Sequence, residues 1–141
     1  DVEGIKRSER QIGELIDQEI ARGIDPGRIV VAGFSQGGAM TLQTALRRPE
    51  RLAGAMVLSA YLLLSDRLPA EAAEANRDLP IFMAHGTFDP VIPMDRAAAS
   101  RQRLEALGWS VEWHAYPMAH QVCAEEIAAI GSWLGGVLKP G

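Results

Sequence analysis

The stretch GFSQGG, residues 33–38, follows directly on the apolar run RIVVA of residues 28–32. Such a short run with β-branched residues is typical of a buried strand in a parallel sheet, and we expect a helix over about 36–48, ended by Pro49. Ser35 therefore lies in a glycine-rich turn between a strand and a helix. Glycine permits close backbone approach and backbone angles that other residues avoid. The turn thus suits either a serine held in a strained conformation or an ordinary tight turn.

Helices and strands alternate along the rest of the chain. Apolar residues recur at helical spacing over residues 2–22, and Gly23 is a typical C-terminal stop. Three further strand-like runs are expected at 52–60, 79–86 and 110–117. Further helices are predicted over 93–108 and 124–138, and a less regular stretch covers 61–78. Four short strands separated mostly by helices imply a parallel sheet built from βαβ units. The predicted fold class is α/β, with one domain over residues 1–141.

Composition narrows the classes of protein to consider. The chain has 141 residues, enough for a domain with its own core, and a net charge of −4 without basic runs. This charge gives no reason to expect a nucleic-acid partner. No apolar run approaches the ~20 residues that span a bilayer. The single cysteine, Cys123, excludes an intrachain disulfide and favours a reducing compartment. Because no signal peptide is visible either, we expect a cytoplasmic protein.

Three chemically suggestive residues follow three of the predicted strands. Ser35 comes after the first strand, Asp89 after the run that ends at Gly86, and His120 after the run that ends at Pro117. Functional groups of open parallel sheets gather beyond the carboxyl ends of the strands. A G-x-S-x-G turn between a strand and a helix, followed in order by an acid and a histidine, is typical of α/β-hydrolases.

This order predicts a catalytic triad. Ser35 is the expected nucleophile, and His120 the base that takes its proton. Asp89 would hold the imidazole in the required tautomer and stabilise its charged form. The backbone N–H of Gln36, the residue after the nucleophile, would donate to the oxyanion. Small residues at Gly33 and Gly37 are expected to keep the serine turn free of clashes.

Each of these features also has a simpler explanation when it is taken alone. A G-x-S-x-G match can be a plain glycine turn. Asp89 followed by Pro90 is common at the start of a turn, and a lone histidine such as His120 is often a surface residue. The hypothesis rests on the conjunction of three correct residue types at three suitable strand ends in the correct order.

The other candidate groups are better explained by structure. His85 is interpreted as a polar residue of a turn, and His114 as part of a solvated or half-buried strand face. No two histidines have metal-ligand spacing, so we expect no metal site. Cys123 does not lie in a glycine-rich turn between a strand and a helix like that of Ser35, the nucleophile elbow. It is interpreted as a small side chain that fills space in the interior. The remaining aromatic and charged residues are assigned to the core or to helix ends, namely Trp109, Trp113, Trp133, Arg47, Arg48, Arg51, Glu125 and Glu126.

Three blocks together resemble the bacterial carboxylesterase/acyl-protein thioesterase family of α/β-hydrolases. They are GFSQGGAMTLQTAL at 33–46, HGTFDPVIP at 85–93 and YPMAHQVCAEEIAAIGSWL at 116–134. The opening DVEGIKRS at 1–8 also resembles the family helix before the elbow strand. The resemblance implies a cofactor-free esterase for small-molecule acyl esters or acyl thioesters. By motif position it assigns the roles given above to Ser35, Asp89, His120 and Gln36.

The chain departs from the family at its start. The resemblance implies an N-terminal portion with the first strands and a His-Gly loop that supplies a second oxyanion donor, and we expect both to be missing here. An elbow strand without its neighbour would expose an unpaired edge. An alternative to the active enzyme is therefore a catalytically impaired fragment that acts as a binding or assembly unit with the missing half. Its expected partners are a complementing N-terminal segment or further copies of this chain.

Apolar residues near the predicted triad suit an acyl pocket, and we name Leu63, Val91 and Met118 for it. The competing interpretation assigns most of these side chains to the core. Acyl length, leaving group and the choice between ester and thioester stay open, and a peptidase or perhydrolase on the same triad is a further alternative.

Overall fold

Four parallel strands form the sheet within residues 1–139, the part of the chain that the computed structural model describes. Their order in space is β1-β2-β3-β4, which is also their order in the chain. The register pairs Val30 with Gly54 and joins Ile81 to both Ala55 and Val111. The strands are Val30–Phe34 (β1), Gly54–Leu58 (β2), Ile81–Gly86 (β3) and Val111–Tyr116 (β4). The predicted α/β class with a parallel sheet is confirmed.

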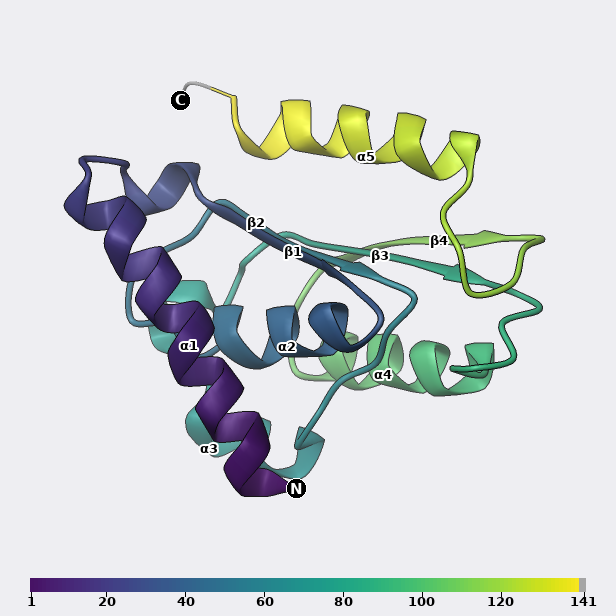
Figure 1. Ribbon diagram of the computed structural model, residues 1–141, viewed down its shortest axis with the longest axis horizontal. Helices are drawn as coiled ribbons and strands as arrows, with labels where there is room; N and C mark the ends of the chain where they lie inside the picture. The colour runs from purple at the N-terminus through teal and green to yellow at the C-terminus, as the bar shows by residue number, and fades with distance from the viewer. Residues whose placement is uncertain (140–141) are drawn as a thin grey trace.

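Helices flank the sheet on both faces (Figure 1). On one face lie α1, α2 and α4, together with the short α3, and on the opposite face lies α5. The helices are Val2–Ala21 (α1), Gln36–Ala45 (α2), Leu68–Glu71 (α3), Met94–Ala106 (α4) and Ala124–Val137 (α5). Short 3₁₀ turns cover Pro26–Arg28, Ser65–Arg67 and Glu74–Asn76. The last two lie in the stretch that the sequence left irregular.

Local chemistry sets the helix ends. Gly23 and Gly108, which follow α1 and α4, have φ angles of 100° and 106°, a left-handed conformation that glycine adopts without strain. The helix predicted to run to about Arg48 ends at Ala45 instead. The amides of Arg47 and Arg48 bond to the carbonyls of Thr44 and Ala45, three residues back, so the last turn tightens before the proline.

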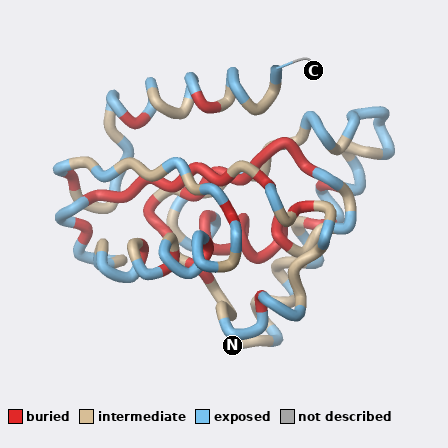
Figure 2. Tube along the Cα trace, turned by 180° about the vertical axis from the view of Figure 1, so that it is seen from behind, coloured by how far each residue is buried: buried red, intermediate tan, exposed pale blue. Residues whose placement is uncertain are grey.

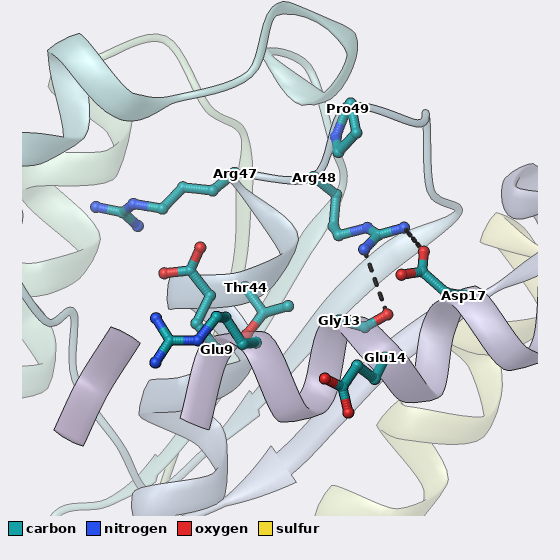
Figure 3. Close-up of a pocket in the computed structure, with 9 residues that line it drawn as sticks. Glu9, Gly13, Glu14, Asp17, Thr44, Arg47, Arg48 and Pro49 are labelled. Carbon is teal, nitrogen blue, oxygen red and sulfur yellow. Dashed lines mark hydrogen bonds and ion pairs between the residues drawn. The ribbon is translucent and has the colours of Figure 1, made fainter. Parts of the chain in front are cut away.

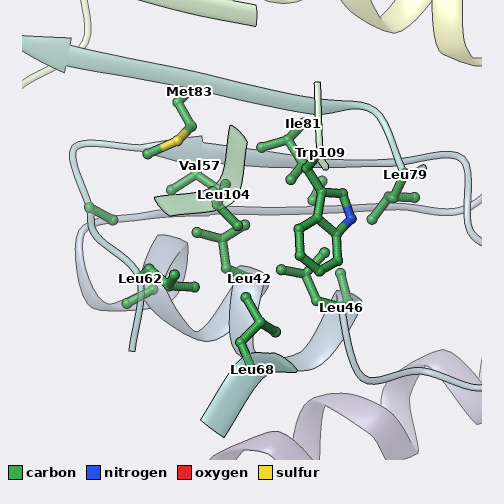
Figure 4. Packing of buried hydrophobic residues seen from close by; sticks show 14 of the residues in the cluster. Leu42, Leu46, Val57, Leu62, Leu68, Leu79, Ile81, Met83, Leu104 and Trp109 are labelled. Carbon is green, nitrogen blue, oxygen red and sulfur yellow. The ribbon is translucent and has the colours of Figure 1, made fainter. Parts of the chain in front are cut away.

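The larger core lies between the sheet and the face with α2 and α4 (Figure 4). Leu42 of α2, Val57 of β2 and Leu104 of α4 are all fully buried there. A smaller cluster on the opposite face joins Met56 and Phe82 to Trp133 of α5. Figure 2 shows the buried trace concentrated in the two central strands, β2 and β3, and in α2. Burial of Trp109 and Trp133 confirms the assignment of these aromatics to the core.

Because α2 follows β1, α4 follows β3 and α5 follows β4, the intervening loops all lie at the carboxyl edge of the sheet. Across residues 1–139, no helix is both long and apolar enough to cross a bilayer.

Candidate active site

Ser35 occupies the turn between β1 and α2 in a strained backbone conformation. Its φ is 58° and its ψ is −124°, values that non-glycine residues rarely adopt. The turn is tied to the sheet and to the helix, because the Ser35 amide donates to the Leu58 carbonyl at 2.8 Å and the Ser35 carbonyl accepts from Gly38 at 2.9 Å. The strained turn is therefore held in place by hydrogen bonds from the Ser35 backbone to β2 and to α2.

Two glycines around Ser35 are required by space, and they differ in part from the predicted pair. A Cβ at Gly33 would overlap the Gly37 backbone, and one at Gly38 would lie 2.8 Å from Ala60 Cβ and 2.9 Å from the Gly33 carbonyl oxygen. A Cβ at Gly37 would have no described heavy atom within 4 Å. The expectation that Gly37 prevents a clash is wrong, because Gly37 is already on the open side of the first helical turn. The close approach is made by Gly33 and Gly38.

The structure brings Ser35, His120 and Asp89 together. His120 Nε2 lies 2.8 Å from Ser35 Oγ, and His120 Nδ1 lies 2.6 Å from Asp89 Oδ2. An ionised carboxylate only accepts, so Nδ1 carries the hydrogen in this bond. In the neutral ring Nε2 is then free to accept the Ser35 hydroxyl proton. The contacts form one directed chain from carboxylate to imidazole to hydroxyl.

Asp89 is held as an ionised acceptor. Burial of this carboxyl pushes its pKa up, but hydrogen bonds from Ile92 N, His120 and Val91 N outweigh burial, so the pKa lies below its ordinary value. The Val91 and Ile92 amides each donate to Oδ1 at 2.8 Å. Because Oδ1 is satisfied by the backbone, Oδ2 is left for His120.

The loops that carry Asp89 and His120 are bonded to each other. The Thr87 amide donates to the Tyr116 carbonyl at 2.8 Å, and the Phe88 amide donates to the Met118 carbonyl at 3.0 Å. At Gly86 a Cβ would overlap the carbonyl oxygens of Met118 and Ala119. The acid and the imidazole therefore sit on two loops that are packed at backbone contact.

Gln36 is the first residue of α2, where backbone N–H groups have no acceptor within the helix. Gln36 also lines a cavity of about 560 Å³ between the amino-terminal half of α1 and the loop after β2. Met40, Tyr61 and Leu63 contribute to the wall of this cavity, and the guanidinium of Arg96 stacks on the Tyr61 ring at 3.6 Å. The cavity therefore adjoins the amino terminus of α2.

The three residues named for an acyl pocket are placed differently from one another. Leu63 lines the cavity beside Gln36. Val91, in the loop after β3, is 61% exposed, whereas Met118, in the loop that leads from β4 to His120, is buried. Of the three, only Leu63 is among the residues that line this cavity, because the direction of a loop side chain depends on turns that the sequence pattern does not specify.

Sequence reasoning overlooked two neighbours of the triad. The Phe34 ring lies 4.8 Å from the His120 ring, centroid to centroid. His85, at the end of β3, is buried, and its Nε2 lies 3.5 Å from Asp89 Oδ2. A spacing of four residues between His85 and Asp89 across a strand end was the available signal for the second contact.

A second pocket, of about 390 Å³, lies between α1 and the end of α2 (Figure 3). Its charged side chains pair mainly with other groups of the protein. Arg48 bonds to Asp17 at 2.7 Å and to the Gly13 carbonyl at 3.3 Å. Arg47 turns away to Glu71 and to the Gln43 carbonyl, in keeping with its predicted place at a helix end.

The remaining candidates have structural surroundings. His114 pairs with Glu112 at 2.8 Å on β4. Cys123 caps the amino terminus of α5, where its amide donates to Glu126 Oε1 at 3.3 Å in a capping box. Burial raises the pKa of Glu126 despite that bond. Within residues 1–139, no group of three His, Cys, Asp or Glu side chains is arranged to hold a metal ion.

A family model described as Phospholipase/Carboxylesterase matches residues 1–137. Acyl-protein thioesterase 1 of Gibberella zeae is 43% identical over 143 residues, which cover 99% of this chain and 61% of that protein. A probable carboxylesterase of Oryza sativa subsp. japonica is 35% identical over 140 residues, covering 99% of this chain and 53% of that protein. These relatives support the family named from the sequence but not its restriction to bacterial members.

Solved structures agree on the fold. The crystal structure of Arabidopsis thaliana SOBER1 superposes with a TM-score of 0.93 at 33% identity, covering 99% of this chain and 67% of that chain. Zea mays acyl-protein thioesterase 2 gives a TM-score of 0.83 at 26% identity, covering 98% of this chain and 66% of that chain. The predicted α/β-hydrolase fold is confirmed. The chain spans between about half and two thirds of the length of these proteins.

Proposed function

The chain belongs to the phospholipase/carboxylesterase family, and from that premise we propose that it is the triad-bearing part of a serine hydrolase for carboxylic esters or acyl thioesters. The observation that carries the proposal is the continuous hydrogen-bond chain Asp89–His120–Ser35, with contacts of 2.6 Å and 2.8 Å. Carboxylate, imidazole and hydroxyl in this order are the parts needed to activate a serine.

In the proposed reaction, Ser35 Oγ attacks the acyl carbon while His120 Nε2 takes its proton. The negative charge that develops on the acyl oxygen is stabilised by the backbone N–H of Gln36 at the start of α2. Asp89 stabilises the imidazolium through Nδ1. His120 then gives its proton to the departing alcohol or thiol, and the acyl group stays on Ser35 as an ester. A water molecule, activated by His120, cleaves this ester and restores the hydroxyl.

The cavity beside Gln36 has a mixed lining. Met40, Tyr61 and Leu63 offer apolar contact, whereas Asp1, Arg7, Ser8, Gln11 and Gln36 add polar groups. It would therefore suit a substrate that carries both an apolar and a polar part. The names of the relatives, acyl-protein thioesterase and probable carboxylesterase, are consistent with acyl transfer to water. We extend the proposal to a cytoplasmic enzyme that needs no cofactor.

The first experiment is intact-mass analysis after exposure to a fluorophosphonate serine probe. We expect one adduct on Ser35 in the wild type and none in Ser35→Ala or His120→Ala, because the hydroxyl needs its base. An adduct that persists in Ser35→Ala would contradict the assignment of the nucleophile. No adduct in a folded wild type would instead favour the alternative, a binding or assembly unit without turnover.

A further inference from the structure

His85 lies at the end of β3, directly beside the carboxylate of the triad. Its side chain is 1% exposed, and its Nε2 lies 2.7 Å from the Ile92 carbonyl oxygen and 3.5 Å from Asp89 Oδ2. A carbonyl only accepts, so Nε2 carries a hydrogen and donates it. The same N–H is therefore close to the carboxylate oxygen that His120 contacts.

The bond to Ile92 closes the turn that carries Asp89. The Ile92 amide donates to Asp89 Oδ1 at 2.8 Å, while the Ile92 carbonyl accepts from His85. Both polar groups of one residue are thus fixed, one by the carboxylate and one by the strand below it. With Oδ1 held in this way, the other carboxylate oxygen, Oδ2, lies 2.6 Å from His120 Nδ1.

The second nitrogen of His85 argues against a role in stability alone. Nδ1 is buried and has no hydrogen-bond partner among the described residues. A buried polar atom without a partner opposes folding. On folding, the ring therefore gains a hydrogen bond at Nε2 but loses the bond that Nδ1 makes to water in the unfolded chain. Such a balance contributes little net stability, but it provides one donor in a fixed direction.

We infer that His85 is a positioning residue, which orients the Asp89 carboxylate toward His120 through the Ile92 carbonyl. The inference rests on the proposed function, because the aim of Asp89 affects rate only if His120 becomes charged during turnover. Among the described residues, two imidazole rings lie against the Asp89 carboxylate, those of His120 and His85. His85 does not touch Ser35 or substrate in this role.

The test compares His85→Gln with His85→Met. Glutamine places an amide donor near the position of Nε2, and methionine fills similar space without a donor. His114→Gln on the neighbouring strand is the matched control, because His114 pairs with Glu112 away from the triad. Hydrolysis of p-nitrophenyl acetate gives kcat and KM, and proton NMR reports the downfield resonance of the His120–Asp89 hydrogen bond.

We expect His85→Met to lose roughly 10- to 100-fold in kcat with little change in KM, the size of effect that misplacement by about 1 Å produces. Its downfield resonance should shift or broaden, while His85→Gln and His114→Gln keep both the rate and the resonance. Unchanged kcat and an unchanged resonance in folded His85→Met would overturn the inference. So would unfolding of His85→Met beside a fully stable and active His85→Gln, since His85 would then serve stability alone.

Failure of the proposed function gives a different pattern. A wild type with no turnover and no adduct on Ser35 would refute the hydrolase, but the NMR resonance would still report whether His85 sets the bond between Asp89 and His120. Loss of that resonance in His85→Met would support the role of His85 in orienting Asp89. Persistence of the resonance in that variant would refute this role.

Discussion

The triad and the α1–α2 pocket both pair acidic with basic side chains, but they arrange them differently. In the pocket, Arg48 is bonded to Asp17, to Glu50 and to a backbone carbonyl. In the triad the contacts run in one direction and end at Ser35 Oγ. In the pocket, Arg47 and Arg48 are engaged in ion pairs with carboxylates, whereas the triad places a ring nitrogen of His120 beside a hydroxyl. The direction of the bonds, more than the number of charges or the size of the cavity, distinguishes a reactive site.

Removing one member from each region should give the largest contrast. Asp89→Asn is expected to lower kcat/KM by about 10,000-fold, because the imidazole loses its tautomer and its counter-charge. Arg48→Ala, in the pocket, should leave kcat/KM within about twofold, since Arg48 has no link to the reacting groups. Steady-state hydrolysis of a short acyl ester measures both. A comparable loss in Arg48→Ala would show that the pocket takes part in the reaction.

Two glycines of the serine turn offer the next test. Gly33→Ala should cost about 1–3 kcal/mol of unfolding free energy, because its Cβ would overlap the Gly37 backbone. Gly37→Ala should stabilise by about 0.5–1 kcal/mol, because its Cβ has open space and alanine suits a helix better. Urea unfolding at neutral pH measures both values. Equal destabilisation by the two substitutions would contradict the described packing.

Asp89 and Glu126 are both buried carboxyls, and we expect opposite effects of pH on stability. The pKa of Asp89 is lowered in the folded state, so its contribution is present above the unfolded pKa and is lost as pH falls through the folded one. The pKa of Glu126 is raised by burial, so folding is disfavoured as pH rises above the unfolded value. Their ordinary values are 3.8 and 4.5.

The measurement is the urea midpoint between about pH 3 and pH 8 for wild type and two variants. Asp89→Asn should flatten the loss of stability on the acid side. Glu126→Gln should instead gain stability toward neutral pH relative to the wild type. A Glu126→Gln variant whose advantage grows as the solution becomes more acidic would reverse the assigned sign.

The smallest effect is expected at the rim of the α1–α2 pocket. Asp17 pairs with Arg48 at 2.7 Å, but its side chain is 62% exposed. Exposed ion pairs contribute about 0–1 kcal/mol, and salt weakens them. Asp17→Asn should therefore cost less than about 1 kcal/mol at low salt and still less at high salt. Thermal unfolding at two ionic strengths tests this, and a cost that grows with salt would exclude the ion pair as its source.

Periodicity and strand ends were sufficient to predict the order of elements and the meeting of Ser35, Asp89 and His120. These depend on chain direction and on the rule that parallel strands share one carboxyl edge. Gly38, rather than Gly37, makes the close contact, because the rotation of the first helical turn decides it. That rotation is set by tertiary contacts, which no local pattern encodes.

Side-chain direction in the loops limited the rest of the prediction. Val91 and Met118 both flank the triad in sequence, yet one is exposed and the other buried. His85 looked like an isolated turn residue because its contact with Ile92 depends on the loop folding back over β3. The chemistry of residue types indicated the reacting atoms, but the groups that orient those atoms became visible only from the fold.

The chain separation of the triad members has a consequence for folding. Asp89 and His120 come from adjacent strands and are 31 residues apart, whereas Ser35 and His120 are 85 residues apart with β2 and β3 between their strands. The acid–base pair can therefore assemble within one β3–α4–β4 unit, before β1 has docked. Under the proposed function, Ser35 would meet its base only after β1 has joined β2, β3 and β4. Labelling of Ser35 by a serine probe would therefore report that the four strands have assembled in their native order.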